Sequence, residues 1–300
     1  GIMSELSNIS NIKEILSRHG FNFSKSMGQN FLINPNICPK MARSCGVTEN
    51  DAVLEIGPGI GVLTFELASL ANKVVSVELD KRLIPVLDET LHKFKNVKII
   101  NSDILKTDIK GLIDKEFPNQ RVFVCANLPY YITSPVIMKL LEEKLPIESI
   151  TVMVQKEAAE RICAEPGSRN SGAISLAVRY YSDPKILFNV SRGSFLPAPN
   201  VDSAVIKLNL LKNPHVSVKN EKLLFDIIKA SFSKRRKTIL NSLSAGLSLP
   251  KKVISGVLDA SNITNNLRAE QLTLEDFAVI ANNLYSIKEG EKSTNEKVNI

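Results

Sequence analysis

The stretch Ala52-Val53-Leu54-Glu55-Ile56-Gly57-Pro58-Gly59-Ile60-Gly61 decides the fold of this chain. Its first five residues form the short, mostly apolar run of a buried strand, and apolar residues at helical spacing begin at Leu63. Glycines between a strand and a helix permit a tight turn and let the backbone approach a ligand closely. Such a loop is also common as a simple turn, so the residues around it must identify any ligand.

Strands and helices alternate along the chain after this loop. Apolar runs predict seven strands, at 52–56, 73–79, 97–101, 121–126, 150–154, 186–190 and 204–210. Helical spacing predicts intervening helices at 63–70, 82–94, 108–116, 134–145, 156–163 and 171–182. Alternation of this kind indicates an α/β fold with a mostly parallel sheet covered on both faces. The last two strands are joined by a Pro-containing loop without a helix, which indicates an antiparallel edge.

The pattern changes after Lys212, and four parts of the chain can be distinguished. Residues 1–25 form an N-terminal segment with a helix at about 9–19, and residues 26–212 form the α/β domain. Residues 213–287 show only helical spacing and are expected to form a small all-α domain. Residues 288–300 are polar and charged, and we expect a disordered tail there.

Composition limits the classes of function. The 300 residues are 44% hydrophobic, enough for a sizeable core, yet no apolar run is long enough to cross a membrane. The four cysteines show no CxxC pairing, so we expect reduced thiols in a cytoplasmic protein without a signal peptide. The three histidines are scattered, so we expect no metal. The net charge is +7, and residues 229–252 carry seven Lys or Arg and no acid, which favours contact with phosphates.

Two acidic residues at the ends of later strands indicate a nucleoside ligand. Glu78 lies 21 residues after Gly57, the distance expected for an acceptor of ribose hydroxyls, and Asp103 ends the third strand. The loop has no basic residue and Glu55 adds negative charge, which disfavours a pyrophosphate and favours a cationic cofactor. S-adenosylmethionine fits these features. The alternatives are a solvated charge at the strand end for Glu78 and a helix N-cap for Asp103.

The tetrapeptide Asn127-Leu128-Pro129-Tyr130 suits alkylation of an exocyclic amine on a nucleobase. Asn127 offers a side-chain carbonyl, and a residue before proline is held extended, which aims the Leu128 carbonyl. Tyr130 offers a ring on which a flipped base can stack. By itself the segment is equally well interpreted as a strand followed by a proline turn.

These motifs together resemble the bacterial small-subunit (16S) rRNA adenine N6,N6-dimethyltransferase family. The resemblance rests on five segments: Gly28–Leu32, Glu55–Gly61, Asn127–Tyr131, Phe195–Ser203 and Phe232–Lys237. They span roughly residues 26 to 245, and none departs from the family pattern at its key positions. The resemblance implies a Rossmann-like class I methyltransferase domain at 26–212 and an rRNA-binding helical domain at 213–287.

The resemblance also implies roles for the cofactor residues. Asn30 and Leu32 would cover S-adenosylmethionine, and Gly57 would lie against its methionine end. Glu78 would bind the ribose hydroxyls and Asp103 the adenine amine.

A second group of residues would hold the target base. Asn127 would contact both ligands, and its side chain and the Leu128 carbonyl, set by Pro129, would accept hydrogen bonds from the target amine. Tyr130 would stack on one face of the base and Phe195 on the other, unless Phe195 is an ordinary core aromatic.

The resemblance implies 16S rRNA in an immature 30S particle as the partner of a monomeric enzyme. Lys25 and the cluster Lys234, Arg235, Arg236 and Lys237 would contact the rRNA backbone; the alternative for part of the cluster is a cap on its helix. Three alternatives stay open: a large-subunit rRNA methyltransferase of the macrolide-resistance type, a non-catalytic ribosome-assembly or transcription factor on the same fold, and a DNA adenine methyltransferase.

Overall fold

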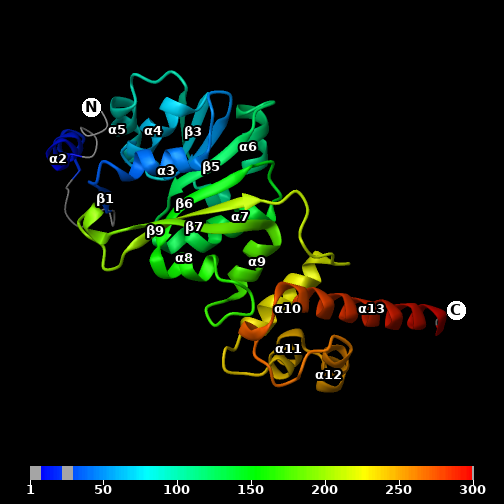
Figure 1. Ribbon diagram of the computed structural model, residues 1–300. Helices are drawn as coiled ribbons and strands as arrows, with labels where there is room; N and C mark the ends of the chain where they lie inside the picture. Colours follow the sequence, from blue (N-terminus) through cyan, green and yellow to red (C-terminus); the bar gives the residue numbers. More distant parts are fainter. Residues whose placement is uncertain (1–7, 22–29, 299–300) are drawn as a thin grey trace. The chain divides into compact units, whose positions relative to one another are not determined.

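The computed structural model describes residues 8–21 and 30–298 (Figure 1). Its main feature is a seven-stranded sheet with the order β4-β3-β2-β5-β6-β9-β7. The strands are β2 (Ala52–Ile56), β3 (Lys73–Glu78), β4 (Val97–Asn101), β5 (Val122–Asn127), β6 (Ser149–Gln155), β7 (Ser182–Val190) and β9 (Ser203–Leu210). Neighbouring strands from β4 to β6 are parallel, whereas β9 runs antiparallel to β6. The predicted α/β sheet with an antiparallel edge is confirmed.

Successive side chains of each strand point to opposite faces of the sheet. Both faces are apolar, and helices pack on them. Their bounds are α3 (Ile37–Cys45), α4 (Val62–Leu70), η1 (Lys81–Leu83), α5 (Ile84–Thr90), η2 (Ile104–Lys106), α6 (Ile109–Glu116), η3 (Tyr130–Ile132), α7 (Thr133–Glu142) and α8 (Lys156–Ile162). The face that carries Val53, Val74 and Cys125 is buried under α3 and α4. Right-handed crossovers then direct α6 and α7 to the opposite face.

A second, two-stranded sheet closes one side of this unit. Strand β1 (Phe31–Leu32) pairs antiparallel with β8 (Phe195–Leu196), which follows the short helix η4 (Arg192–Ser194). Leu32 lies opposite Phe195, so two sequence motifs more than 160 residues apart become neighbours. Helix α2 (Ile9–Arg18) packs near this sheet, where Ile12 and Leu16 are buried in a cluster with Phe31.

The chain divides into two compact units, and the second is helical. The first unit comprises the chain up to Ala159 together with Pro184–Leu210. The second comprises Glu160–Asp183 and the chain from Leu211 onward. Its elements are α9 (Ala173–Tyr181), α10 (Glu221–Phe232), α11 (Ile239–Leu247), α12 (Lys251–Ala260), η5 (Ala269–Gln271) and α13 (Leu274–Val298).

Several boundaries differ from those predicted. Residues 160–183 were expected in the α/β domain, but Leu176 and Tyr180 of α9 are buried in the same apolar cluster as the C-terminal helices. Residues 288–298 were expected to be disordered, yet α13 remains helical to Val298. Helix α3 was not predicted, and the helix expected at 82–94 ends at Thr90.

Alanine substitutions at two glycines on helices of the second unit should have opposite effects on the free energy of unfolding. A Cβ on Gly246 of α11 would lie 2.5 Å from Ala230 Cβ on α10, so Gly246→Ala should lower the free energy of unfolding by about 1–3 kcal/mol through overpacking. A Cβ on Gly256 of α12 meets nothing within 4 Å, so Gly256→Ala should raise that free energy by up to about 1 kcal/mol. Chemical denaturation of both variants tests this, and equal effects would contradict the close packing of α10 on α11.

Candidate functional site

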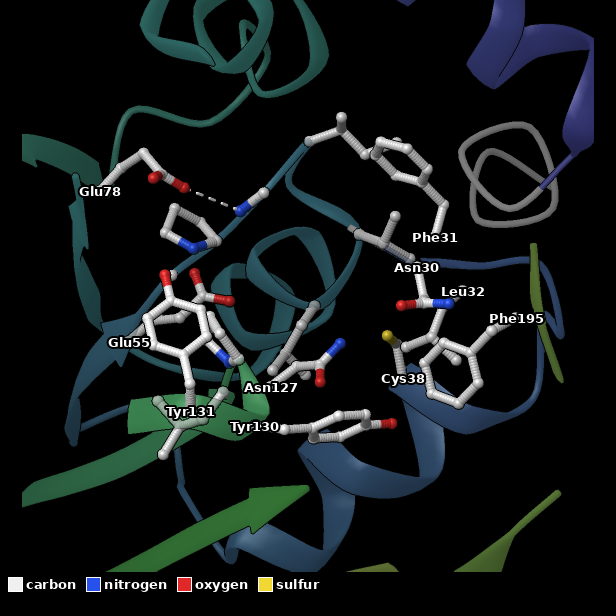
Figure 2. Close-up of a pocket in the computed structure, with 18 residues that line it drawn as sticks. Asn30, Phe31, Leu32, Cys38, Glu55, Glu78, Asn127, Tyr130, Tyr131 and Phe195 are labelled. Carbon is white, nitrogen blue, oxygen red and sulfur yellow. Dashed lines mark hydrogen bonds between the residues drawn. The ribbon is translucent and has the colours of Figure 1, made fainter. Parts of the chain in front are cut away.

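A cavity of about 360 Å³ lies at the carboxyl ends of β2, β3 and β5. Four of the five motifs contribute to its lining, together with a few residues outside them: Asn30, Phe31, Leu32, Cys38, Glu55, Gly57, Pro58, Gly59, Ile60, Val62, Leu63, Glu78, Asn127, Leu128, Pro129, Tyr130, Tyr131 and Phe195. The sheet order reverses between β2 and β5, and open α/β sheets bind ligands at such a point. Figure 2 shows Asn127 between an end that carries Glu78 and an end that carries Phe195.

The glycine loop has the backbone conformation that its sequence requires. Gly57 has a φ of +68° and Gly59 a φ of +60°, in the left-handed region that side chains disfavour. A Cβ on Gly59 would meet nothing within 4 Å, so the backbone borders open space. The Gly59 N–H donates to Glu78 Oε1 at 3.2 Å, which ties the loop to the end of β3.

Two carboxyl groups on the cavity wall are almost completely buried. Glu55 is 1% exposed and accepts hydrogen bonds from the hydroxyls of Thr64 and Ser76. Burial raises the pKa of Glu55 to about 7 despite these bonds. Burial also raises the pKa of Glu78, which is 6% exposed and accepts N–H groups from Gly59 and Asp80. A cation in this cavity would favour the ionised form of both groups.

Asn127 ends β5 with its side chain available to a ligand. In the part of the chain that the structure describes, no hydrogen bond to the Asn127 amide is found. The carbonyl of Leu128 likewise accepts none from the described residues, whereas that of Pro129 accepts from Ile132 N–H at 3.2 Å. Two acceptors from consecutive residues therefore remain for an amine.

Two aromatic rings stand beside Asn127. Figure 2 shows the Tyr130 ring below the Asn127 amide and the Phe195 ring next to it. The Tyr130 hydroxyl lies 2.9 Å from Ser203 Oγ, which fixes the orientation of that ring from β9. Phe195 is 4% exposed and packs in the core of the first unit, yet it also lines the cavity. The position of Phe195 is therefore consistent with both interpretations, a core aromatic and a part of the cavity wall.

The N-terminal motif and the proline-rich loop meet over the cavity. Leu32 lies opposite Phe195 in the β1–β8 pair, and Asn30 donates through its side chain to the carbonyl of Pro197. Neither contact was expected, because strands of two residues carry no period that sequence analysis can detect.

Some lining residues were missed by sequence reasoning. Cys38 comes from α3, a helix that was not predicted. Tyr131 is 81% exposed at the rim, although its position directly after Tyr130 could have marked it. Figure 2 shows its ring on the side of Glu55, away from Phe195.

Other predicted site residues lie outside the cavity. Asp103 is the N-cap of η2, where its Oδ1 accepts the Leu105 N–H at 3.0 Å, and it is not among the lining residues. The alternative interpretation as an N-cap therefore describes this carboxylate in the structure. Lys25 lies outside the described residues.

The basic cluster lies in the loop between α10 and α11. Lys234, Arg235, Arg236 and Lys237 are all exposed, and no hydrogen bond or ion pair joins their side chains to other described residues. Ser233 is the C-cap residue of α10 and Thr238 the side-chain N-cap of α11, so these polar residues occupy the caps. The four cations remain available to a partner.

Neither a metal centre nor a membrane span is present among the described residues. Within residues 8–21 and 30–298, no group of three His, Cys, Asp or Glu side chains is arranged to hold a metal ion. No helix in the described ranges is long and apolar enough to span a bilayer. The four cysteines are free, and three of them are buried.

Comparison with known proteins gives consistent results. The chain is 51% identical over 283 residues to the ribosomal RNA small subunit methyltransferase A of Alkaliphilus oremlandii, covering 94% of this chain and 99% of that protein. It is 47% identical over 279 residues to the protein of the same name from Bacillus licheniformis, covering 92% and 96%.

Solved structures with this fold include two that match over most of the chain. A dimethyladenosine transferase from Plasmodium falciparum matches with a TM-score of 0.68 and 29% identity over 82% of this chain and 94% of that chain. The 23S rRNA methyltransferase ErmE matches with a TM-score of 0.65 and 26% identity over 85% and 100%. Residues 20–285 match the family described as ribosomal RNA adenine dimethylase. The chain therefore belongs to the ribosomal RNA adenine dimethylase family.

Proposed function

We propose that this protein transfers methyl groups from S-adenosylmethionine to the N6 amines of two adjacent adenines in the 3′-terminal hairpin of 16S rRNA, within an immature 30S particle. The observation that supports this most directly is a pair of acceptors, Asn127 and the Leu128 carbonyl, to which no described residue donates, beside two aromatic rings and a glycine loop.

The cavity fits the proposed cofactor. S-adenosylmethionine, when bound, supplies a methyl group on a positively charged sulfonium. Glu78 would accept the ribose hydroxyls, and the loop backbone at Gly57 and Gly59 would lie against the methionine portion. The buried carboxyls of Glu55 and Glu78 favour a cation over a pyrophosphate. Asn30 and Leu32 would cover this end of the cavity, and we retain Asp103 as the partner of the adenine amine through its second carboxylate oxygen.

The chemistry requires little beyond positioning. An adenine amine is a poor nucleophile because its lone pair is delocalised into the ring. Hydrogen bonds accepted by Asn127 Oδ1 and the Leu128 carbonyl, which Pro129 holds in place, localise that lone pair as the nitrogen becomes tetrahedral. Tyr130 and Phe195 would hold the flipped base flat, with Tyr130 itself fixed by Ser203. The leaving proton passes to water, so no general base is needed.

The second unit provides the RNA contact in this proposal. Its exposed cations at Lys234–Lys237 would neutralise backbone phosphates, together with Lys25 from the N-terminal segment. We take the helical domain, residues 213–287 as predicted and enlarged by 160–183, as the rRNA-binding part. The protein would act as a monomer in the cytoplasm.

Fold similarity alone does not choose between small-subunit and large-subunit rRNA. The TM-scores to the dimethyladenosine transferase and to ErmE, 0.68 and 0.65, are nearly equal. Sequence identity separates them, because the small-subunit proteins reach 51% and ErmE only 26%. The small-subunit substrate is therefore favoured.

The proposed substrate predicts the outcome of a labelling experiment. The protein is incubated with methyl-labelled S-adenosylmethionine and, separately, immature 30S particles, mature 30S, 50S particles and duplex DNA. Label is expected in dimethyladenosine of the immature 30S sample alone, measured after nuclease digestion. Label in 50S or DNA would refute the proposed substrate, and no transfer to any sample would refute the activity.

Loss of the Asn127 acceptor should affect the chemical step selectively. Asn127→Ala is expected to lower the rate of transfer at least about a hundredfold, since one acceptor in the transition state is removed. Affinity for immature 30S, measured by filter binding, should change less than about threefold, because the exposed cations are untouched. A variant that keeps the wild-type rate would contradict the role given to Asn127.

The raised pKa of Glu55 predicts how cofactor binding depends on pH. Below pH 7 the carboxyl is mostly protonated and above pH 7 mostly ionised, so affinity for a cation should rise by up to about tenfold from pH 6 to pH 8. Titration calorimetry with S-adenosylmethionine measures this, and Glu55→Gln should flatten the rise. The neutral thioether S-adenosylhomocysteine is the matched control ligand and should show a smaller pH effect. Equal slopes for wild type and Glu55→Gln would exclude Glu55 as the source.

A further inference from the structure

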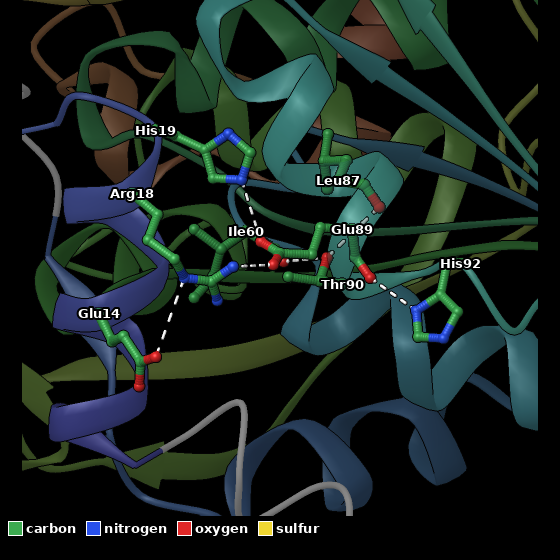
Figure 3. Close-up of polar contacts among 8 residues, drawn as sticks. All are labelled: Glu14, Arg18, His19, Ile60, Leu87, Glu89, Thr90 and His92. Carbon is green, nitrogen blue, oxygen red and sulfur yellow. Dashed lines mark hydrogen bonds and ion pairs between the residues drawn. The ribbon is translucent and has the colours of Figure 1, made fainter.

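The backbone of the glycine loop is held by the end of α5. Thr90, the last residue of α5, donates its hydroxyl to the carbonyl of Ile60 at 2.8 Å. Ile60 lies in the loop and lines the cavity. Figure 3 shows Thr90 and Ile60 next to each other at the point where α5 ends. The hydroxyl therefore fixes the position of a peptide group in the glycine loop, although Thr90 itself does not line the cavity.

The glycine loop packs closely against the end of α5. Gly61 has a φ of +95°, and a Cβ at this position would lie 3.0 Å from Thr90 Oγ1 and 3.2 Å from the Leu91 side chain. The close approach that glycine permits here is an approach to Thr90 rather than to a ligand. A change at Thr90 is therefore transmitted directly to the loop backbone.

The residue before Thr90 binds the N-terminal helix. Both carboxylate oxygens of Glu89 are used, one by the Arg18 guanidinium and the other by His19 Nε2 at 3.0 Å. The hydrogen bond from His19 lowers the pKa of Glu89, so the carboxylate is ionised at neutral pH. Figure 3 shows Arg18 and His19 reaching Glu89 from α2, with Glu14 one turn earlier beside Arg18.

Apolar contacts place α2 against two walls of the cavity. Ile12 and Leu16 are fully buried, and their cluster contains Ile60 from the glycine loop and Phe31 from β1. Both of these residues line the cavity. The helix is therefore positioned to set the separation between the loop and β1.

We propose that Thr90 and Glu89 are positioning residues for the methyl donor. Thr90 holds the glycine loop through the Ile60 carbonyl, and Glu89 holds α2 next to the same loop through its ion pairs. The affinity for the donor then depends on two residues that do not line its cavity. This inference rests on the proposed function, because it takes the cavity as the site of the donor.

The inference is tested by titration calorimetry with S-adenosylmethionine and S-adenosylhomocysteine. Thr90→Val keeps the shape of the side chain and removes the hydroxyl, so the Kd for both nucleosides should rise about three- to tenfold, the range for one neutral hydrogen bond. Thr90→Ser keeps the hydroxyl and should stay within about twofold of wild type. Glu89→Gln should also raise the Kd. In the double variant of Glu89→Gln and Thr90→Val, the factor by which Kd rises should be smaller than the product of the two single factors.

Two further measurements separate positioning from general stability. The KM for the donor should rise while kcat at saturating donor and the KM for RNA stay at wild-type values, because neither residue touches the reacting groups. Asp226→Asn removes a carboxylate from an exposed ion pair with Lys222 on α10 and is the control, with unchanged donor affinity.

The outcomes are distinguishable. If wild type binds neither nucleoside, the proposed function fails. If wild type binds and both Thr90→Val and Glu89→Gln bind equally well, the positioning role is overturned while the proposed function stands. A rise in Kd that Thr90→Ser does not rescue, or that follows the melting temperatures of the variants, would also overturn it.

Discussion

The parallel pairing of β2 with β5 is the constraint on which the site depends. Ile56 lies opposite Ala126, so Gly57, directly after β2, lies next to Asn127, the last residue of β5. A slip of one residue would turn Asn127 to the other face of the sheet. The glycine loop and the proposed amine acceptors are therefore held together by the backbone pairing of two buried strands.

The parts of the fold that sequence analysis predicted are those with a clear period or a fixed place relative to a strand. Glu78 and Asn127 were found because each lies at the carboxyl end of an apolar strand, and both line the cavity. Asp103 follows a strand equally well, but the turn after it uses the carboxylate as a cap, a local competition that spacing does not reveal. The β1–β8 pair was missed because its strands have two residues each and are joined only by tertiary contacts. The helical end of α13 was missed because its polar composition resembles that of disordered chains.

The acidic groups of the cavity and the basic cluster lie in different units of the protein. The cavity contains buried carboxyls at Glu55 and Glu78, although the chain as a whole has a net charge of +7. The exposed cations at Lys234–Lys237 belong to the other compact unit. An acidic cavity disfavours the entry of phosphate, whereas the basic loop favours it, so a nucleic acid backbone and a cationic small molecule are directed to different parts of one chain.

The unequal size of the two sheets has a consequence for how the cavity opens. One wall belongs to a seven-stranded sheet, and the other includes a pair of strands with two residues each. Because local opening costs less where few backbone hydrogen bonds and contacts are lost, the β1–β8 pair should separate at a far lower free energy than the large sheet. A wall that opens alone would allow a used nucleoside to leave while Asn127 and the strands around it keep their geometry, as repeated transfers to one target require.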